Sequence, residues 1–357
     1  MKIINKRNPK IVVIGGGTGS FTLLQSLKKY TKNITAVVNM ADDGGSTGTL
    51  RDELGVLPPG DVRQCLVALS PESSKVRELF NYRFEEGGLQ GHAFGNLFLT
   101  ALEKMSGGTF VDAVETASAV LNITGKVVPA TLDNVRLRMS WPHKQLILKG
   151  ERIIDTEDFR YDPRTATLSL MPSAKANPAA LAAIRQADLV VLAPGDLYTS
   201  LGPILVASGF RKALQDTLST VVYVCNLVTK KGQTDGFDAV AHADEIERFV
   251  GAPVIDVLLY NTDKPPIDLL EKYASKGELW VEAPPKSFLT KHYEAIGGKF
   301  LASTVVPKAN EKGDKLAEHR SFIRHDSNKV ARALFRLSES NSHTRIGAML
   351  RRLAITK

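Results

Sequence analysis

The stretch Ile11-Val-Val-Ile-Gly-Gly-Gly-Thr-Gly-Ser-Phe-Thr-Leu-Leu-Gln-Ser-Leu27 decides the fold of this chain. Its four β-branched residues, 11–14, predict a strand that is buried on both faces of a parallel sheet. The glycine-rich segment 15–19 then predicts a turn, and leucines at 23, 24 and 27 recur at helical spacing. A strand, a glycine turn and a helix in this order present backbone N–H groups to an anion.

This glycine turn matches no complete phosphate-binding motif. The third glycine of the dinucleotide fingerprint would fall at Ser20, and no Lys follows that would make a P-loop. The glycines either bind phosphate or permit close packing at a tight strand-to-helix turn. A second glycine-rich segment further along the chain favours phosphate binding.

Composition predicts one large α/β domain. The chain has 357 residues, of which 43% are hydrophobic, and its formal net charge is +8. A basic protein suits an acidic partner such as a nucleotide, a nucleic acid or an anionic lipid. The sequence has no zinc-finger spacing, no RNA-recognition aromatic motif and no long basic run, so nucleic acid is not the expected partner.

The chain is expected to be cytosolic. Residues 1–10 lack the apolar core of a signal peptide, and no apolar run approaches the length of a membrane span. The two cysteines, Cys65 and Cys225, are predicted to be separate buried thiols rather than a disulfide or a metal site.

A second predicted strand, 34–40, runs into the segment Ala41-Asp-Asp-Gly-Gly-Ser-Thr-Gly48. Because ligands of doubly wound sheets bind beyond the carboxyl ends of the strands, this segment and the first glycine turn are predicted to line one pocket. Two carboxylates beside a diphosphate require a divalent cation between them, so Asp42 and Asp43 are predicted to bind Mg²⁺. Alternatively, one of them accepts hydrogen bonds from a ribose or a substrate hydroxyl, or both serve only the turn.

Other polar residues fall near predicted helix starts. Asp61 is expected to cap a helix with Arg63 in its first turn, where Arg63 either faces an anionic group or is simply solvated. His92 and Asn96 lie four residues apart near the start of another helix, and each is either a ligand contact or structural.

Two later strands also end in polar loops. The loop Pro194-Gly-Asp-Leu-Tyr-Thr-Ser-Leu-Gly-Pro203 follows the strand 188–193, and Asn226 and Thr229 follow the strand 220–226. Four predicted strands thus end in polar, glycine-rich loops at the same edge of the sheet, which we call the rim. The presence of four such loops at one edge predicts a ligand site more strongly than any single loop.

The character of the chain changes within 125–172, where alternating apolar residues predict a small antiparallel insertion. Asp155, Glu157 and Asp158 are expected to form a solvated loop there. We therefore predict a single Rossmann-like domain over 1–334, with a doubly wound, mostly parallel sheet, and a helical C-terminus capped at Asp326 or Ser327. A basic helix or tail over 335–357 would either dock on the domain or meet a partner or an anionic surface.

Six ordered motifs, spread from residue 11 to about residue 334, resemble those of the YvcK-like gluconeogenesis factors, within the larger family of the phospholactate transferase CofD. The motifs are Gly15-Gly-Gly-Thr-Gly19, Ala41-Asp-Asp-Gly-Gly-Ser-Thr-Gly48, Leu57-Pro-Pro-Gly-Asp-Val-Arg63, Gly91-His with Gly95-Asn-Leu, Pro194-Gly-Asp-Leu-Tyr-Thr-Ser200 and Arg324-His-Asp326. Two positions depart from the family, because Asp196 stands where Ser is more usual and Ala241-His242 replaces Asp-His.

The resemblance implies a Rossmann-like fold, a cytosolic bacterial protein and binding of nucleotide-sugars such as UDP-N-acetylglucosamine. It also implies that Tyr273 and Arg324 make distal contacts to uridine or diphosphate. With the positions expected from the residues themselves, the residues predicted to bind the ligand are Gly16, Gly17, Thr18, Asn39, Asp43, Arg63, Asn96, Gly195, Tyr198, Thr199, Ser200, Asn226, Tyr273 and Arg324, and those predicted to bind the metal are Asp42 and Asp43.

The residues and what the resemblance implies together leave two functions open. The first is a nucleotide-sugar-binding regulator without turnover, needed for cell shape and wall precursor supply on gluconeogenic carbon, with a protein partner in wall synthesis and a homo-oligomer both open. It is preferred because the sequence offers no Ser-His-Asp ordering and no His-rich metal motif. The second is a Mg²⁺-dependent transferase that moves a phospholactyl-type group from a nucleotide diphosphate to a deazaflavin alcohol, with Asp42 and Asp43 holding the metal or deprotonating the acceptor.

Overall fold

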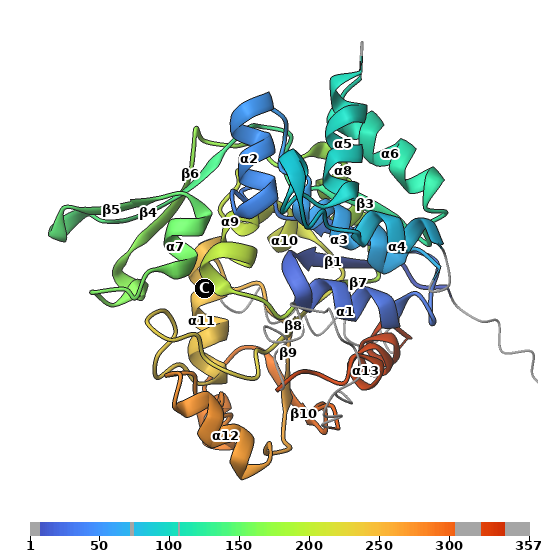
Figure 1. Ribbon diagram of the computed structural model, residues 1–357. Helices are drawn as coiled ribbons and strands as arrows, with labels where there is room; N and C mark the ends of the chain where they lie inside the picture. Colours follow the sequence, from blue (N-terminus) through green and yellow to red (C-terminus); the bar gives the residue numbers. More distant parts are fainter. Residues whose placement is uncertain (1–7, 72–74, 106–107, 304–322, 340–357) are drawn as a thin grey trace, which may run out of the picture.

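The computed structural model describes residues 8–71, 75–105, 108–303 and 323–339. Its centre is a seven-stranded sheet in the order β10-β9-β8-β7-β1-β2-β3, in which every neighbouring pair is parallel (Figure 1). The strands are β1 Ile11–Gly15, β2 Ile34–Val38, β3 Lys126–Pro129, β7 Leu189–Leu192, β8 Thr220–Val224, β9 Val257–Asn261 and β10 Glu294–Gly298. The predicted doubly wound parallel sheet is confirmed.

Helices cover both faces of this sheet, which explains why every residue of β1 is buried. Val12 and Ile14 point to one face and pack in a core with the helices α8 Pro178–Gln186, α9 Gly202–Leu205, α10 Phe210–Asp216 and α11 Ala239–Val250. Ile11 and Val13 point to the other face and pack with the helices α1 Gly17–Leu27, α3 Gly60–Leu69, α5 Phe94–Lys104, α6 Phe110–Val120 and α13 Ser327–Glu339. The unbroken apolar run of β1 thus follows from its burial on both sides.

Three further helices lie at the margins of this layered body. They are α2 Gly45–Leu54, α4 Lys75–Asn81 and α12 Ile267–Ala274. Short 3-10 turns occupy Gly87–Leu89, Pro142–Lys144, Pro163–Thr165 and Pro285–Phe288, and one π-helical turn spans Leu197–Leu201. Much of the segment 41–48, expected to be a loop, is therefore the first turn of α2.

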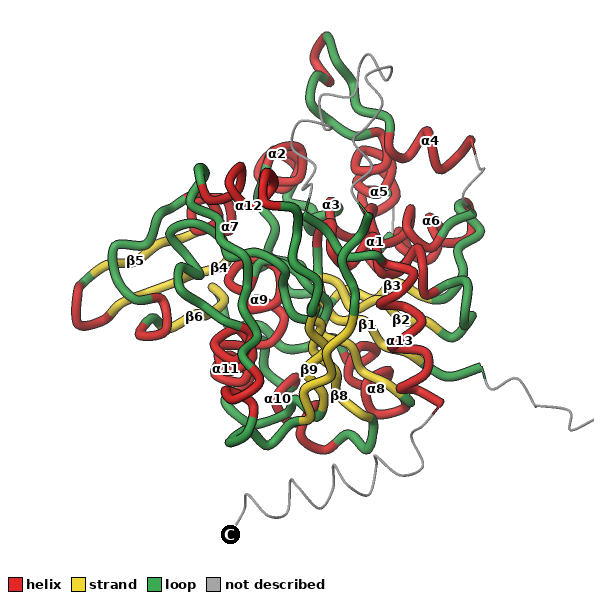
Figure 2. The backbone as a smooth tube through the Cα atoms, turned by 90° about the horizontal axis from the view of Figure 1, so that it is seen from below, coloured by secondary structure: helices red, strands yellow, loops and turns green. Residues whose placement is uncertain are grey.

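A three-stranded antiparallel sheet projects from one side of the body (Figures 1 and 2). It consists of β4 Arg136–Trp141 between β5 Leu146–Lys149 and β6 Thr167–Met171, and the helix α7 Glu151–Thr156 follows β5. The alternating residues Leu137, Met139 and Trp141 are buried against the main core, as their spacing predicts. The strand β3 also falls within 125–172 but pairs with β2 in the parallel sheet, so the antiparallel unit begins at Arg136.

The C-terminal helix packs against the first helix. Ser327 and Ser26 share a hydrogen bond of 2.8 Å between their hydroxyl groups, and the carboxylate of Asp326 accepts from the N–H groups of Asn328 and Lys329 at 3.1 Å each. The predicted cap at Asp326 is confirmed. Most of the predicted basic tail, 340–357, lies outside the described residues.

Two further expectations can be compared with the structure. Cys65 and Cys225 are both free and buried, which confirms the prediction of separate thiols. Among the helices that the structure describes, none is long and apolar enough to cross a membrane.

Candidate functional site

The candidate site lies where the strand order reverses. β1 is followed in the sheet by β2 on one side, whereas the chain later returns to place β7 on its other side, and such switch points open a crevice at the carboxyl ends of the strands. The loops after β1 and β7 meet there so closely that a Cβ atom added to Gly19 would lie 1.8 Å from the carbonyl oxygen of Pro194. The four strands predicted to supply the rim are consecutive neighbours, in the order β8-β7-β1-β2.

Asp61 lies beneath the glycine turn. Its carboxylate accepts a hydrogen bond of 3.0 Å from the N–H of Gly17, and a Cβ atom at Gly16 would lie 2.3 Å from its second oxygen. The predicted helix cap is wrong, because Pro59 occupies the cap of α3 and Asp61 lies within the first turn. Burial raises the pKa of this carboxyl to about 7, and the nearby charge of Asp42 adds to the effect.

Two more carboxyl groups face Asp61. Burial raises the pKa of Asp42, although the N–H of Gly44 and the hydroxyl of Thr47 oppose this shift. Glu151, the first residue of α7, has its pKa raised to about 9 by burial and then by the charges of Asp42 and other acidic neighbours. We call Asp42, Asp61 and Glu151 the carboxylate cluster. Its members disfavour one another's charged forms, so the cluster favours a proton or a cation.

The carboxylate of Asp43 has different hydrogen-bond partners from that of Asp42. Its carboxylate accepts from Arg136 at 3.2 Å and from the N–H of Arg152 at 2.7 Å, which ties the segment after β2 to β4 and α7. A Cβ atom at Gly150 would lie 2.8 Å from the same carboxylate. Within the described part of the chain, no group of three or more His, Cys, Asp or Glu side chains is placed to hold a metal ion.

Several predicted residues pack around the cluster. Asn39 is buried, donates to the backbone oxygen of Thr199 at 3.1 Å and accepts from the N–H of Ala41 at 3.0 Å. Thr18 is exposed on the first turn of α1. Gly16 is buried, and Gly17 lies half-buried at the start of the same helix.

Arg63 and Asn96 join two further residues beside the cluster. The Nε of Arg63 donates to Oδ1 of Asn96 at 2.9 Å, and Nδ2 of Asn96 donates to Oγ of Ser46 at 3.2 Å. Oγ of Ser46 in turn lies 3.0 Å from Nδ1 of His92. Burial lowers the pKa of Arg63 to about 10, and Gly95 leaves room for its side chain, since a Cβ atom there would lie 2.7 Å from Cδ of Arg63. Arg63 is thus a buried donor rather than a solvated surface residue.

The loop after β7 divides between rim and core. Gly195 and Ser200 are half-buried at the rim, and the amide of Asn226 donates to the carbonyl oxygen of Gly195 at 2.9 Å. Tyr198 is fully buried, and its ring lies 5.5 Å, centroid to centroid, from those of Phe159 and Phe249. The structure therefore places Tyr198 in the core below the rim.

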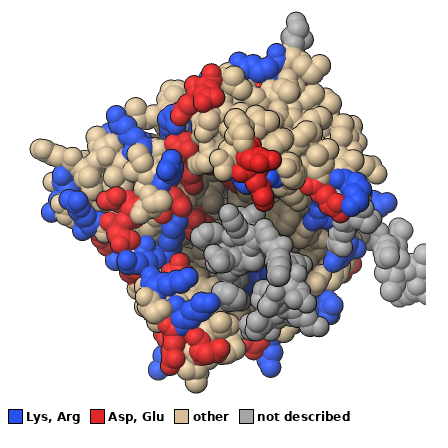
Figure 3. Space-filling view, in the orientation of Figure 1, with Lys and Arg blue, Asp and Glu red and all other residues tan. Residues whose placement is uncertain are grey.

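A charged group that the sequence analysis did not identify joins this loop to α7. Lys230, after β8, forms ion pairs with Asp155 and, at 3.2 Å, with Asp196, while Oγ1 of Thr199 donates to Asp155 at 3.1 Å. The amide of Gln233 also donates to the carbonyl oxygens of residues 154 and 155. The expectation of a solvated acidic loop was wrong for Asp155, because the loop after β8 folds back onto it. Figure 3 shows acidic and basic side chains interspersed over the face that carries this insertion.

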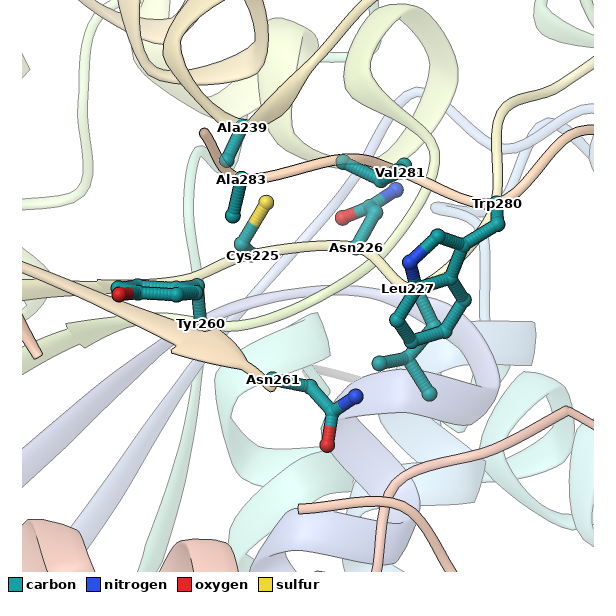
Figure 4. Close-up of a pocket in the computed structure, with 9 residues that line it drawn as sticks. All are labelled: Cys225, Asn226, Leu227, Ala239, Tyr260, Asn261, Trp280, Val281 and Ala283. Atoms are coloured by element: carbon teal, nitrogen blue, oxygen red, sulfur yellow. The ribbon is translucent and has the colours of Figure 1, made fainter. Parts of the chain in front are cut away.

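A small pocket lies further along the rim, between the ends of β8 and β9. Cys225, Asn226, Tyr260, Asn261 and Trp280 contribute to its lining (Figure 4). Both amides already serve the backbone: that of Asn226 bonds to Gly195, whereas that of Asn261 donates to the oxygen of Asp263 at 2.6 Å and accepts from the N–H of Phe300 at 2.8 Å. Both side-chain amides therefore hold backbone segments of the rim in place through these hydrogen bonds.

The two distal residues occupy different environments. Tyr273 is buried, and its hydroxyl accepts from the N–H of Ile323 at 3.2 Å. Arg324 is exposed between that contact and His325, which is hydrogen-bonded to the backbone of Cys225 and whose pKa burial lowers to about 4. The motif Arg324-His-Asp326 therefore anchors the chain through its last two residues, whereas the side chain of Arg324 is exposed.

The sequence profile of a family described as 2-phospho-L-lactate transferase CofD matches residues 11–301. The gluconeogenesis factor of Bacillus subtilis is 36% identical over 330 residues, covering 92% of this chain and 98% of that protein. The gluconeogenesis factor of Listeria innocua is 38% identical over 330 residues, covering 91% and 94%.

Among solved structures, a crystal structure of a UPF0052 family member from Bacillus halodurans matches with a TM-score of 0.80 and 33% identity. The match covers 92% of this chain and 99% of that one. Sequence and structural likeness thus extend over the whole α/β body, including the loops that form the candidate site. The chain belongs to the CofD family and is similar within it to the proteins named gluconeogenesis factors.

Proposed function

We propose that this chain is a cytosolic regulator that binds a nucleotide-sugar of the UDP-N-acetylglucosamine type and supports cell shape and wall precursor supply on gluconeogenic carbon. The names of its relatives support the metabolic setting. The ligand class is supported by one observation above all, which is the carboxylate cluster held directly beneath a glycine turn at the switch point of the sheet.

The cluster fits a divalent cation that a diphosphate would bring with it. Mg²⁺ prefers hard oxygen ligands and takes one or two carboxylates together with phosphate oxygens and water, so a protein site of three side chains is not required. Asp42 and Asp61 would hold the ion, and its charge would relieve the repulsion that raises both pKa values. Asp43, paired with Arg136, would orient the segment rather than bind the ion.

The backbone around the cluster suits phosphate oxygens. The first turns of α1 and α2 carry no acidic residue, and neither helix has a side-chain cap. The N–H of Gly17 donates to Asp61, so at α1 an anion would meet the N–H groups that follow Gly17, and the positive end of each helix dipole favours an anion there. Arg324, exposed beyond the same rim, would supply a charged donor to the distal part of the ligand.

Thermal unfolding with UDP-N-acetylglucosamine, UDP-glucose, GDP or NAD, each with and without Mg²⁺, tests this proposal. A ligand at 100 times its dissociation constant adds about 2.7 kcal/mol of stability. We expect selective stabilisation by UDP-sugars, with the nucleotide-sugar recovered at the end. A preference for GDP, or no stabilisation by any UDP-sugar, would contradict the proposal, and GDP with Mg²⁺ would favour the transferase reaction named for the family.

The metal is tested separately by calorimetric titration of UDP-N-acetylglucosamine. Wild-type protein is expected to bind more tightly with Mg²⁺ than with EDTA, and Asp42→Asn is expected to lose that difference. Asp52→Asn is the matched control, because its carboxylate is exposed and contacts Arg136 outside the cluster. Equal affinity with and without Mg²⁺ in the wild type would remove the ion from the proposal.

A further inference from the structure

Four side chains beside the carboxylate cluster form a continuous hydrogen-bonded row. It runs from Arg63 through Asn96 and Ser46 to His92, with donor–acceptor distances of 2.9, 3.2 and 3.0 Å. Arg63 and Asn96 are buried, whereas Ser46 and His92 are half-buried. We call this row the relay. The proposed function uses neither Ser46 nor His92.

The direction of the first two hydrogen bonds in the relay is set by its first member. A guanidinium only donates hydrogen bonds, so the atom of Asn96 that faces Arg63 is its carbonyl oxygen. The amide nitrogen of Asn96 then faces Ser46 and donates to its oxygen. The hydroxyl oxygen of Ser46 has two lone pairs, so its contact with Nδ1 of His92 can run in either direction. The direction that continues the row has Ser46 donating to Nδ1, with the ring proton of the neutral imidazole on Nε2.

The helical turn that carries Ser46 borders the proposed diphosphate site. Ser46 belongs to the first turn of α2, one residue before Thr47, whose hydroxyl is hydrogen-bonded to Asp42. A Cβ atom at Gly60 would lie 2.4 Å from Oγ1 of Thr47 and 2.7 Å from Oδ2 of Asp42, so this turn and the start of α3 meet at the cluster. A serine hydroxyl whose proton is held by an imidazole is the arrangement that activates serine as a nucleophile.

We propose that Ser46 accepts a phosphorus-containing group from the bound nucleotide-sugar, with His92 as the base. This inference rests on the proposed ligand class. Oγ of Ser46 forms a bond to one phosphorus of the diphosphate, the bond from that phosphorus to the bridging oxygen breaks, and the hydroxyl proton passes to Nδ1 of His92. Attack on one phosphorus leaves a nucleotidyl group on Ser46 and releases a sugar phosphate, whereas attack on the other leaves a sugar phosphate group and releases a nucleoside monophosphate.

The product is a chain that carries one group from its ligand, covalently attached to Ser46. No second substrate is required, and the reaction need not repeat, so it is compatible with a regulator that does not consume its ligand in bulk. The attached group would outlast dissociation of the free nucleotide-sugar.

The direction of the relay is tested by nitrogen NMR of the histidine rings in the ligand-free protein. We expect the Nδ1-acceptor, Nε2–H tautomer for His92. Asn96→Asp replaces the donor with a carboxylate that only accepts, so Ser46 would donate to position 96 and His92 would shift its proton to Nδ1. Asn81→Asp places the same charge on the other side of Arg63, whose Nη1 bonds Asn81 at 3.0 Å, and should leave the tautomer unchanged. An Nδ1–H tautomer in the wild type would overturn the relay.

The transfer is tested by intact mass measurement after incubation with UDP-N-acetylglucosamine and Mg²⁺, with fragmentation to locate the added group. We expect one added nucleotidyl or sugar phosphate group on Ser46 and an equal amount of the complementary product. Ser46→Ala should abolish the addition, and His92→Gln should slow it on the order of 100-fold. Thr49→Ala, which alters an exposed hydroxyl on the next turn of α2, is the matched control and should behave as wild type.

Binding measured on the same samples separates the two proposals. Calorimetric binding without any added mass would overturn the transfer and leave the proposed function intact. An added group that persists in Ser46→Ala would also overturn it. Absence of both binding and added mass would mean that the ligand class itself is wrong.

Discussion

Asp61→Asn should make the protein more stable at pH 8 while leaving it little changed at pH 4. The pKa of Asp61 is raised to about 7 in the folded chain from an ordinary value of 3.8. The folded state therefore retains a proton that the unfolded chain releases at lower pH. The stability contributed by this group is complete below the unfolded value and is lost as pH rises through the folded value. An amide has no proton to lose, so the variant should lack this decline.

The size of the effect follows from the shift. One pKa unit corresponds to about 1.4 kcal/mol, so a shift of this size limits the loss to about 4 kcal/mol for one buried carboxyl. We expect the variant to exceed the wild type by about 1–4 kcal/mol at pH 8, because the amide oxygen can still accept from the N–H of Gly17.

Urea unfolding at half-unit pH steps from 4 to 8.5, in EDTA to exclude divalent cations, measures this difference. The curves of free energy against pH should converge near pH 4, separate between about pH 4 and pH 7, and run parallel above that range. Asp216→Asn, at an exposed ion pair with Lys212, is the control and should run parallel to the wild type. If Asp61→Asn also runs parallel to the wild type throughout, the buried carboxyl does not carry the assigned proton.

Three other substitutions test the site in the same framework. Gly16→Ala should cost about 1–3 kcal/mol in urea unfolding because the new methyl group meets the carboxylate of Asp61, whereas Gly88→Ala, with open space around it, should change stability by less than about 0.5 kcal/mol. Lys230→Met should cost about 1 kcal/mol, since two partly exposed carboxylates lose their cation, and high salt should reduce the difference; a salt-independent loss would point to packing instead. Arg324→Ala should weaken UDP-N-acetylglucosamine binding by about 1.5–3 kcal/mol in calorimetry with an unchanged unfolding midpoint, and wild-type affinity would exclude it from the ligand contacts.

The fold was largely predictable because the signals that define it are local. Four consecutive β-branched residues, 11–14, can be satisfied only where both faces of a strand are covered, and the alternation at 135–141 requires one covered face. Because each polar motif follows a predicted strand, the sequence also predicts that the glycine turn and the other strand-end loops lie together at the rim. That part of the site follows from parallel topology, because every strand of such a sheet ends at the same edge.

The remaining part of the site depends on contacts between distant segments. Glu151 reaches the carboxylate cluster only because the antiparallel unit folds back over the rim, and no local pattern encodes that return. Lys230 and Asp155 are 75 positions apart, so neither residue signals the other. Asp61 stood out in the sequence as an acidic residue at a predicted helix start. The same position is compatible with a helix cap and with a carboxylate beneath the glycine turn, and only the structure, in which Pro59 is the cap, distinguishes the two.

The link between α7 and the loop after β8 also constrains how related chains can differ in length. Residues 142–145 form an exposed hairpin tip, where an inserted or deleted residue would disturb no contact with the rim. One residue gained or lost within α7 between Glu151 and Asp155 would rotate one of these side chains relative to the other by about 100°, so that both could not keep their partners. Natural variants of this protein should therefore tolerate changes of length at the hairpin tip and preserve the number of residues from 151 to 155, a bias that a library of single-codon insertions would reveal.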